Sequence, residues 1–195
     1  MYHVSQDARS KASAKAISNA LMRTLEALPL ADVKIIDLVK IAGVGRATFY
    51  RCFDTVDDVI RYICDETYLQ CGIALKSQLD LSQDYRLDET FIKPYLLFWE
   101  QHTNIVRLII KTDKIGVFNA AFNHMLKLLM VQFPEIEIPY YNYYVAMRSA
   151  ISTAVLIEWV KSDMDLTHEQ LTNLYLSQNT DDSLLIEQLI QRSHQ

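Results

Sequence analysis

Glycine and proline are scarce in this chain of 195 residues, which has four of each, whereas average usage gives about 14 and 10. Hairpin turns and phosphate-binding loops depend on these residues, so their scarcity argues against a many-stranded barrel and a nucleotide-binding loop. Half of the residues are hydrophobic and a tenth are aromatic, which is too apolar for a disordered chain. We therefore expect a helical, globular protein with a substantial core.

Other features that would mark an enzyme, a secreted protein or a membrane protein are also missing. The three cysteines show no CxxC spacing, which favours reduced thiols over a disulfide framework. The first residues contain no apolar leader, and lysines or arginines interrupt every apolar stretch before the ~20 residues that a bilayer requires. No catalytic triad order, HExxH motif or Walker loop occurs, and His102 and His124 are isolated. The sequence predicts a cytoplasmic non-enzyme with no membrane span, cofactor or metal site.

Charge is distributed unevenly along the chain, whose net charge is −5. Residues 1–55 carry eight basic and five acidic side chains, whereas residues 56–195 carry 11 basic and 19 acidic ones. The N-terminal part is thus mildly basic, with a net charge of +3, and the remainder is acidic, at −8. The net charge alone argues against a general nucleic-acid binder, but this asymmetry leaves an N-terminal part that can approach DNA.

Hydrophobic periodicity predicts a series of helices and no sheet. Residues 1–9 are polar and expected to be loose, and helices are expected at 10–28, 33–42, 45–52 and about 55–79. Asp32 and Thr55 are the expected N-caps of the second and fourth helices, and Gly43 ends the second. Later helices are expected at about 88–102, 104–111, 115–133, 140–162, 167–177 and 181–193. Pro94 should kink the first of these or mark its start.

The segment 33–53 carries the clearest functional signal. Two short helices are joined by a tight turn at Gly43-Val44-Gly45, the helix-turn-helix arrangement in which the second helix can enter the major groove of DNA. Val44 and Phe49 can fill the small core, and polar side chains remain for the exposed side.

These residues resemble the TetR family of bacterial transcriptional regulators. The resemblance rests on residues 42–44 (Ala-Gly-Val), 46–51 (Arg-Ala-Thr-Phe-Tyr-Arg) with Phe53, and 55–59 (Thr-Val-Asp-Asp-Val). It implies an all-α, Ω-shaped homodimer with an N-terminal three-helix helix-turn-helix DNA-binding domain and a C-terminal helical ligand-binding and dimerisation bundle. The domains would be residues 1–55 and 56–195, connected by the fourth helix at about 55–79. Residues 146–160 and 166–171 also resemble the late helices of dihydroxyacetone-kinase-type regulators of that family.

The resemblance also assigns DNA-contacting positions. Arg46, Ala47 and Thr48 would face the groove, with Arg46 suited to bidentate contact with guanine, while Tyr50 and Arg51 would lie near phosphates.

Two positions depart from the family pattern. Val56 stands where the family usually has a phosphate-contacting lysine, and Lys34 stands where it usually opens the second helix with threonine. Lys34 offers a replacement contact with phosphate. Such contacts set affinity and salt dependence rather than sequence choice.

The C-terminal part contains candidates for an effector pocket and for a dimer interface. Aromatic and methionine side chains at helical spacing predict a pocket for a small apolar or aromatic effector, although such stripes are more often packed core. The pocket candidates are Phe98, Trp99, His102, Phe122, Met125 and Met147. Small and aliphatic residues of the last two helices predict a two-fold four-helix interface. Its candidates are Ser149, Thr153, Leu156, Trp159, Leu185 and Leu189.

Two functional hypotheses follow. The first is a dimeric regulator, a repressor, that binds a palindromic double-stranded DNA operator and is released by its effector through linkage. The second is a protein-interaction co-regulator that keeps the fold but binds its operator weakly or not at all, which the acidic body and Val56 favour.

Overall fold

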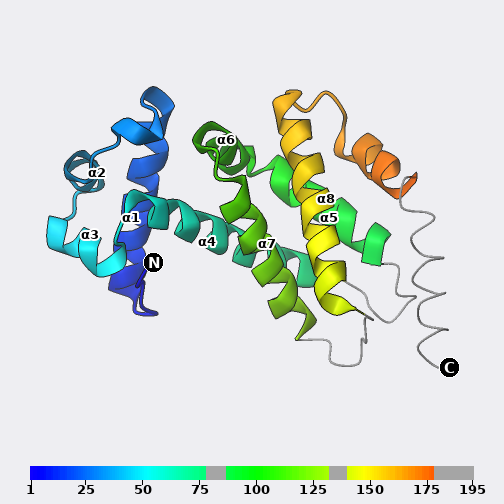
Figure 1. The fold of residues 1–195 in the computed structure, drawn as a ribbon, viewed down its shortest axis with the longest axis horizontal. Helices are drawn as coiled ribbons and strands as arrows, with labels where there is room; N and C mark the ends of the chain where they lie inside the picture. The colour runs from blue at the N-terminus through cyan, green and yellow to red at the C-terminus, as the bar shows by residue number, and fades with distance from the viewer. Residues whose placement is uncertain (78–86, 132–139, 178–195) are drawn as a thin grey trace. The chain divides into compact units, whose positions relative to one another are not determined.

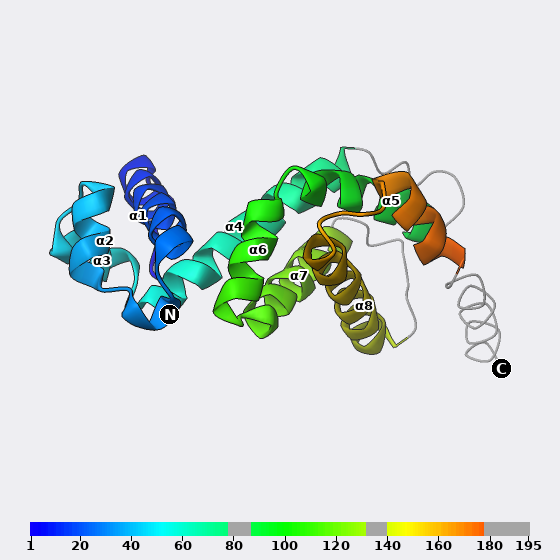
Figure 2. The same cartoon turned by 90° about the horizontal axis from the view of Figure 1, so that it is seen from above.

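The computed structural model describes residues 1–77, 87–131 and 140–177 (Figures 1 and 2). These residues are helical apart from their connections, and they include no strand beyond an isolated bridge between Tyr2 and Phe53. The expected all-α fold class is confirmed. The last expected helix, 181–193, lies outside the described residues, as do Leu185 and Leu189.

The described chain divides into two compact units. The first comprises Met1–Thr67 and Arg107–Ala121, and the second comprises Tyr68–Val106 and Phe122–Gln195. The internal segment Arg107–Ala121 therefore belongs to the same unit as the N-terminal residues. This division differs from the single domain boundary expected at residue 55.

The first unit begins with α1, Ala8–Ala27, followed by the 3-10 turn η1, Leu30–Asp32. The Asp7 carboxylate accepts a hydrogen bond from the Ser10 N–H at 2.8 Å, so the helix begins two residues before the expected start. Pro29 follows the last turn, where the sequence predicts a stop.

Three further helices complete the N-terminal part: α2, Ile35–Ala42; α3, Arg46–Cys52; and α4, Val56–Lys76. The sequence predicts Asp32 as the N-cap of α2, and this prediction was wrong. Asp32 lies in η1, and Lys34 occupies the capping position instead. Thr55 does cap α4. Its hydroxyl accepts from the Asp58 N–H at 3.3 Å, and the Asp58 carboxylate accepts from the Thr55 N–H at 3.0 Å.

Helices α1, α2 and α3 pack around one apolar core, at the blue and cyan end of Figures 1 and 2. The sequence spacing places Ile17, Leu21, Leu25 and Leu28 on one stripe, of which the first three are buried, whereas Leu28 follows the end of α1 and is 43% exposed. Leu38 of α2 and Phe49 of α3 are also fully buried. The two short helices therefore owe their positions to tertiary packing rather than to their own length.

The later helices are α5, Leu87–Glu100; α6, Thr103–Thr112; α7, Ile115–Met130; and α8, Tyr141–Lys161. Residues 168–177 form another helical stretch. Pro94 lies inside α5 rather than at its start. Thr167 caps the last stretch by exchanging hydrogen bonds with Gln170, at 2.9 and 3.2 Å.

Within the second unit, α7 and α8 run side by side in both views (Figures 1 and 2). Aromatic side chains from α4, α5 and α7 meet in one buried cluster, in which Phe122 stacks on Tyr68 at 5.0 Å and on Tyr95 at 5.1 Å between ring centroids. Trp99 meets Tyr68 edge-on at 4.9 Å. This cluster forms much of the unit's core.

Candidate nucleic-acid interface

The turn between α2 and α3 depends on a single glycine. Gly43 has φ +66° and ψ +29°, a left-handed conformation, and follows the last residue of α2. Its N–H bonds back to the Lys40 carbonyl at 3.3 Å, and the Val44 N–H bonds to the Val39 carbonyl at 3.0 Å. This is the glycine C-cap expected from the sequence, and it turns the chain so that α3 can start at Arg46.

Helix α3 separates buried from exposed side chains cleanly. Phe49 and Cys52 are buried, Thr48 is half-buried, and Arg46, Ala47, Tyr50 and Arg51 are exposed. An exposed helical face that carries two arginines and a tyrosine offers several donors to phosphate or base edges.

Two arginines of α3 are held by neighbouring side chains. Arg46 lies over the Tyr50 ring, with its Cζ 5.6 Å from the ring centroid, and its Nη2 donates to the Tyr50 hydroxyl at 3.4 Å. The Arg51 Nη2 donates to the Thr48 hydroxyl at 3.5 Å. Tyr50 therefore restricts the conformations of Arg46, which lowers the entropy lost when that side chain binds.

A groove of about 530 Å³ runs along this face. Its lining brings together three of the six sequence-predicted DNA-contacting residues, Lys34, Arg46 and Tyr50. Ala47, Thr48 and Arg51 belong to the same helix but do not line the groove. The remaining lining residues are Val33, Ile35, Ile36, Asp54, Thr55 and Val56.

Two residues of this groove were missed by the sequence reading. Ile36 is 62% exposed, which is unusual for an isoleucine in a helix with a buried face. Asp54 places a carboxylate among the basic residues. Only its position, directly after Phe53 at the end of the recognition motif, could have singled it out.

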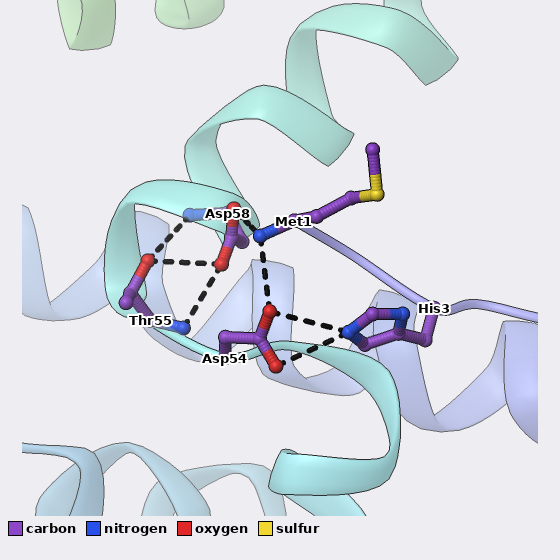
Figure 3. Close-up of polar contacts among 5 residues, drawn as sticks. All are labelled: Met1, His3, Asp54, Thr55 and Asp58. Atoms are coloured by element: carbon purple, nitrogen blue, oxygen red, sulfur yellow. Dashed lines mark hydrogen bonds and ion pairs between the residues drawn. The ribbon is translucent and has the colours of Figure 1, made fainter.

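The N-terminal segment engages this carboxylate, as Figure 3 shows. The Asp54 oxygens lie 3.1 and 3.2 Å from His3 Nε2, and the Met1 ammonium donates to Asp54 at 3.1 Å. The ammonium, followed by His3, holds the pKa of Asp54 below its ordinary value. Met1 and His3 thus contact the connection between α3 and α4, and the expectation of a loose start was wrong for them.

The six effector-pocket candidates do not share one lining. Trp99, Phe122 and Met125 are buried in the core, whereas Met147 is 59% exposed on α8. Phe98 and His102 stack on each other at 4.1 Å, half-buried.

A cavity of about 20 Å³, enough for roughly one water molecule, lies among other residues of α5, α7 and α8. These are Phe91, Leu126, Leu129, Met130, Tyr144, Val145 and Arg148. Arg148 was missed by the sequence reading. Its Nη1 donates to the Tyr175 hydroxyl at 2.8 Å, and its Cζ lies 5.4 Å from the Tyr144 ring centroid.

Helix α8 carries apolar side chains on both of its faces. The predicted interface residues Ser149, Thr153, Leu156 and Trp159 are buried within the chain itself. The other face exposes large apolar side chains at four-residue spacing, with Tyr143 at 73%, Met147 at 59% and Ile151 at 43%.

The described residues contain neither a metal-binding cluster nor a membrane-spanning helix. In residues 1–77, 87–131 and 140–177, no group of His, Cys, Asp and Glu side chains could hold a metal ion. Within the same part of the chain, every helix is too short or too polar to cross a membrane.

No protein-family model and no curated protein matches this chain. Among solved structures, Lin0861 of Listeria innocua superposes with a TM-score of 0.76 at 21% identity, over 94% of this chain and 98% of that one.

Two further solved structures share the fold. The dihydroxyacetone kinase operon activator DhaS superposes with a TM-score of 0.55 at 16% identity, over 85% of this chain and 95% of that one. The fatty acid degradation regulator FadR of Bacillus halodurans gives 0.50 and 15%, over 88% and 94%. At these identities the likeness establishes a shared helical fold.

Proposed function

We propose that this chain is a DNA-binding transcriptional regulator of the TetR type, in which α3 is the recognition helix. The observation that carries the proposal is the groove that joins Lys34 of α2 to Arg46 and Tyr50 of α3. The glycine turn and the buried Phe49 fix α3 with its basic face outward. The regulatory names of DhaS and FadR, which share the fold, support the same function.

Lys34 and the exposed residues of α3 are proposed to make two kinds of contact, with bases and with phosphates. Arg46 is proposed to read guanine through two parallel hydrogen bonds, with Ala47 and Thr48 close to the bases. Lys34, Tyr50 and Arg51 are proposed to contact phosphates, which sets affinity and salt dependence. Lys34 takes the place of the lysine that the family has where this chain has Val56.

Selection from random double-stranded DNA tests this function directly. The full chain should enrich a palindromic site and protect both halves of it from nuclease at about 0.1 M salt. Enrichment of no sequence, together with equal affinity for all duplexes, would overturn the proposal.

The proposal includes a homodimer, because a palindrome requires two recognition helices related by a two-fold axis. Four of the six predicted interface residues are buried within the chain, so we place the contact on the exposed face of α8 that contains Tyr143, Met147 and Ile151. An exposed apolar stripe of this kind marks an interaction site.

Sedimentation of variants tests this contact. Met147→Lys should shift the protein from dimer to monomer, while Leu69→Lys, the same kind of change at an exposed apolar position of α4, should leave the dimer intact. A dimer that survives Met147→Lys and Ile151→Lys together would refute this face.

The proposed regulation is release from DNA by a small apolar or aromatic effector that binds near the aromatic cluster of the second unit. Because the cavity beside Arg148 holds only about 20 Å³, side chains must move to admit an effector, and such movement is the source of linkage.

Residues 107–121 belong to the first unit and contact its helices α1 and α4. Lys111 of α6 donates to the carbonyls of Leu25 and Glu26 at the end of α1, and Lys114 pairs with Asp57 of α4 at 3.1 Å. Screening of apolar compounds by thermal shift, followed by the effect of each hit on DNA affinity, tests the regulation. Hits that bind without changing DNA affinity would contradict it.

Repression is proposed as the outcome of DNA binding. A reporter gene placed behind the selected site should fall in expression when the chain is present and recover in the Arg46→Ala variant. A rise in expression would make the chain an activator.

A protein-interaction co-regulator remains the second candidate. The observation that favours it is exposed apolar surface on α2, where Ile36 is 62% and Ile41 47% exposed. It predicts a partner protein whose capture survives Arg46→Ala but is lost in Ile36→Lys.

A further inference from the structure

The N-terminal segment, residues 1–4, lies beside the C-terminal end of the proposed recognition helix in space. Tyr2 forms an antiparallel bridge with Phe53, and the His3 N–H donates to the Cys52 carbonyl at 2.8 Å. Cys52 is the last residue of α3, so this bond satisfies one of the carbonyls that the helix leaves without an internal partner. Between His3 and Cys52 lie 48 residues of chain, and the contact is therefore tertiary.

The Tyr2 side chain anchors the segment to α4. Its ring meets Tyr62 edge-on at 5.4 Å, and Tyr62 in turn meets Phe53 at 5.6 Å. Its hydroxyl donates to the Asp65 carboxylate at 2.8 Å. Burial, followed by the bond to Asp65, raises the pKa of this hydroxyl, so it stays protonated as the donor. These contacts tie residue 2 to the middle of α4.

This anchoring brings His3 to Asp54, the carboxylate of the DNA-facing groove (Figure 3). The Asp54 side chain is 54% exposed, and both of its oxygens lie within hydrogen-bond distance of His3 Nε2. A free carboxylate among Lys34, Arg46 and Tyr50 would repel approaching phosphates and compete for Arg46. His3 and the Met1 ammonium, which donates to Asp54 at 3.1 Å, occupy the Asp54 oxygens instead.

We propose that residues 1–4 contribute to DNA binding: Tyr2 docks the segment on α4, and His3 engages Asp54 beside the recognition helix. This inference rests on the proposed DNA-binding function and assigns His3 and Tyr2 a positioning role within it. Free Asp54 lowers DNA affinity, and His3, together with the Met1 ammonium, suppresses that effect.

A double-mutant cycle tests the assignment, with the full chain carrying no residues before Met1. The probes are a duplex selected from random sequence by the unaltered chain and a scrambled duplex of equal length. His3→Ala should weaken binding to both duplexes by about threefold, the size expected for one exposed polar contact. Asp54→Asn alone should change affinity by less than about twofold, because the carboxylate is already engaged.

The decisive comparison is the double variant, which should bind as Asp54→Asn does, since His3 has nothing left to suppress. His3→Gln, which keeps a side-chain donor, should restore most of the affinity that His3→Ala loses. For Tyr2, Tyr2→Ala should reproduce the loss seen with His3→Ala, while Tyr2→Phe, which keeps the ring on Tyr62, should lose less.

Equal losses from His3→Ala with and without Asp54→Asn, or no loss at all, would overturn the role of residues 1–4 while leaving DNA binding intact. Thermal unfolding of each variant identifies a merely structural effect, because a destabilised first unit would lose DNA affinity both with Asp54 and with Asp54→Asn. Failure of the unaltered chain to prefer its selected duplex would overturn the proposed function and this inference together.

Discussion

Gly43 provides a test of the turn that places α3, because its contribution can be isolated. A Cβ added at Gly43 meets no heavy atom within 4 Å, but the residue has φ +66°. Gly43→Ala therefore introduces backbone strain without a clash. A left-handed conformation costs an L-residue about 1–2 kcal/mol, and the stiffer unfolded chain returns about 0.4–1 kcal/mol. The expected net loss is about 1 kcal/mol.

Gly116 is a matched control for this substitution. It lies in the first turn of α7, has no positive φ, and also has open space around an added Cβ. Gly116→Ala should therefore stabilise the protein by about 0.5 kcal/mol, since glycine is unfavourable in helices. For a chain of this size, 1 kcal/mol corresponds to about 2–4 °C in Tm.

Thermal unfolding followed by far-UV circular dichroism measures both variants. Gly43→Ala should lower Tm by about 3 °C and Gly116→Ala should raise it by about 1–2 °C. Gly43→Asn should fall between the parent and Gly43→Ala, because asparagine tolerates the left-handed region better. A Gly43→Ala variant as stable as its parent would refute the inference that this turn requires a positive φ.

Three further predictions concern other contacts. Lys111→Met should destabilise the protein by about 1 kcal/mol, because the carbonyls at the end of α1 lose their donor; an unchanged Tm would contradict this. Burial raises the pKa of Asp58, but the Met1 ammonium and Thr55 outweigh it and leave that pKa below its ordinary value. Its contribution to stability is therefore present above the unfolded-state pKa, about 3.9, and is lost as pH falls through the lower folded-state pKa. Asp58→Asn should flatten the acid end of a Tm–pH profile, and a profile as steep as the parent's would exclude this role. Burial raises the pKa of Cys64 to about 12 and that of Cys71 further, so neither thiol should react with Ellman's reagent at pH 8 until the protein unfolds, and rapid native-state labelling would show that they are accessible.

The helices could be predicted from the sequence where local signals were strong. The glycine after α2 and the Thr55 cap act through neighbouring residues, and the structure has both. The apolar stripe of α1 is buried at three of its four predicted positions, with Leu28 exposed. Asp32 was a wrong cap because η1 occupies the residues after Pro29, and a 3-10 turn of three residues leaves no periodic signal.

The candidate site was predictable only in part, for a physical reason. Helical periodicity shows which residues of α3 share a face, but not which side chains of other segments meet them. Asp54 and His3 come together through pairing over fifty residues. Similarly, α8 is apolar all round, so its sequence could not distinguish the buried face of Leu156 from the exposed face of Met147.

The central claim is that α3 reads DNA sequence through Arg46. The most direct measurement is the affinity of the parent, Arg46→Ala and Arg23→Ala for the selected and scrambled duplexes at fixed salt. Arg23 is an exposed residue of α1 outside the groove, so its variant removes the same charge. Arg46→Ala should weaken binding to the selected duplex about 10- to 100-fold, the cost of a bidentate base contact, and reduce the preference over the scrambled one. Arg23→Ala should change both affinities only slightly. Unaltered preference in Arg46→Ala would contradict the claim.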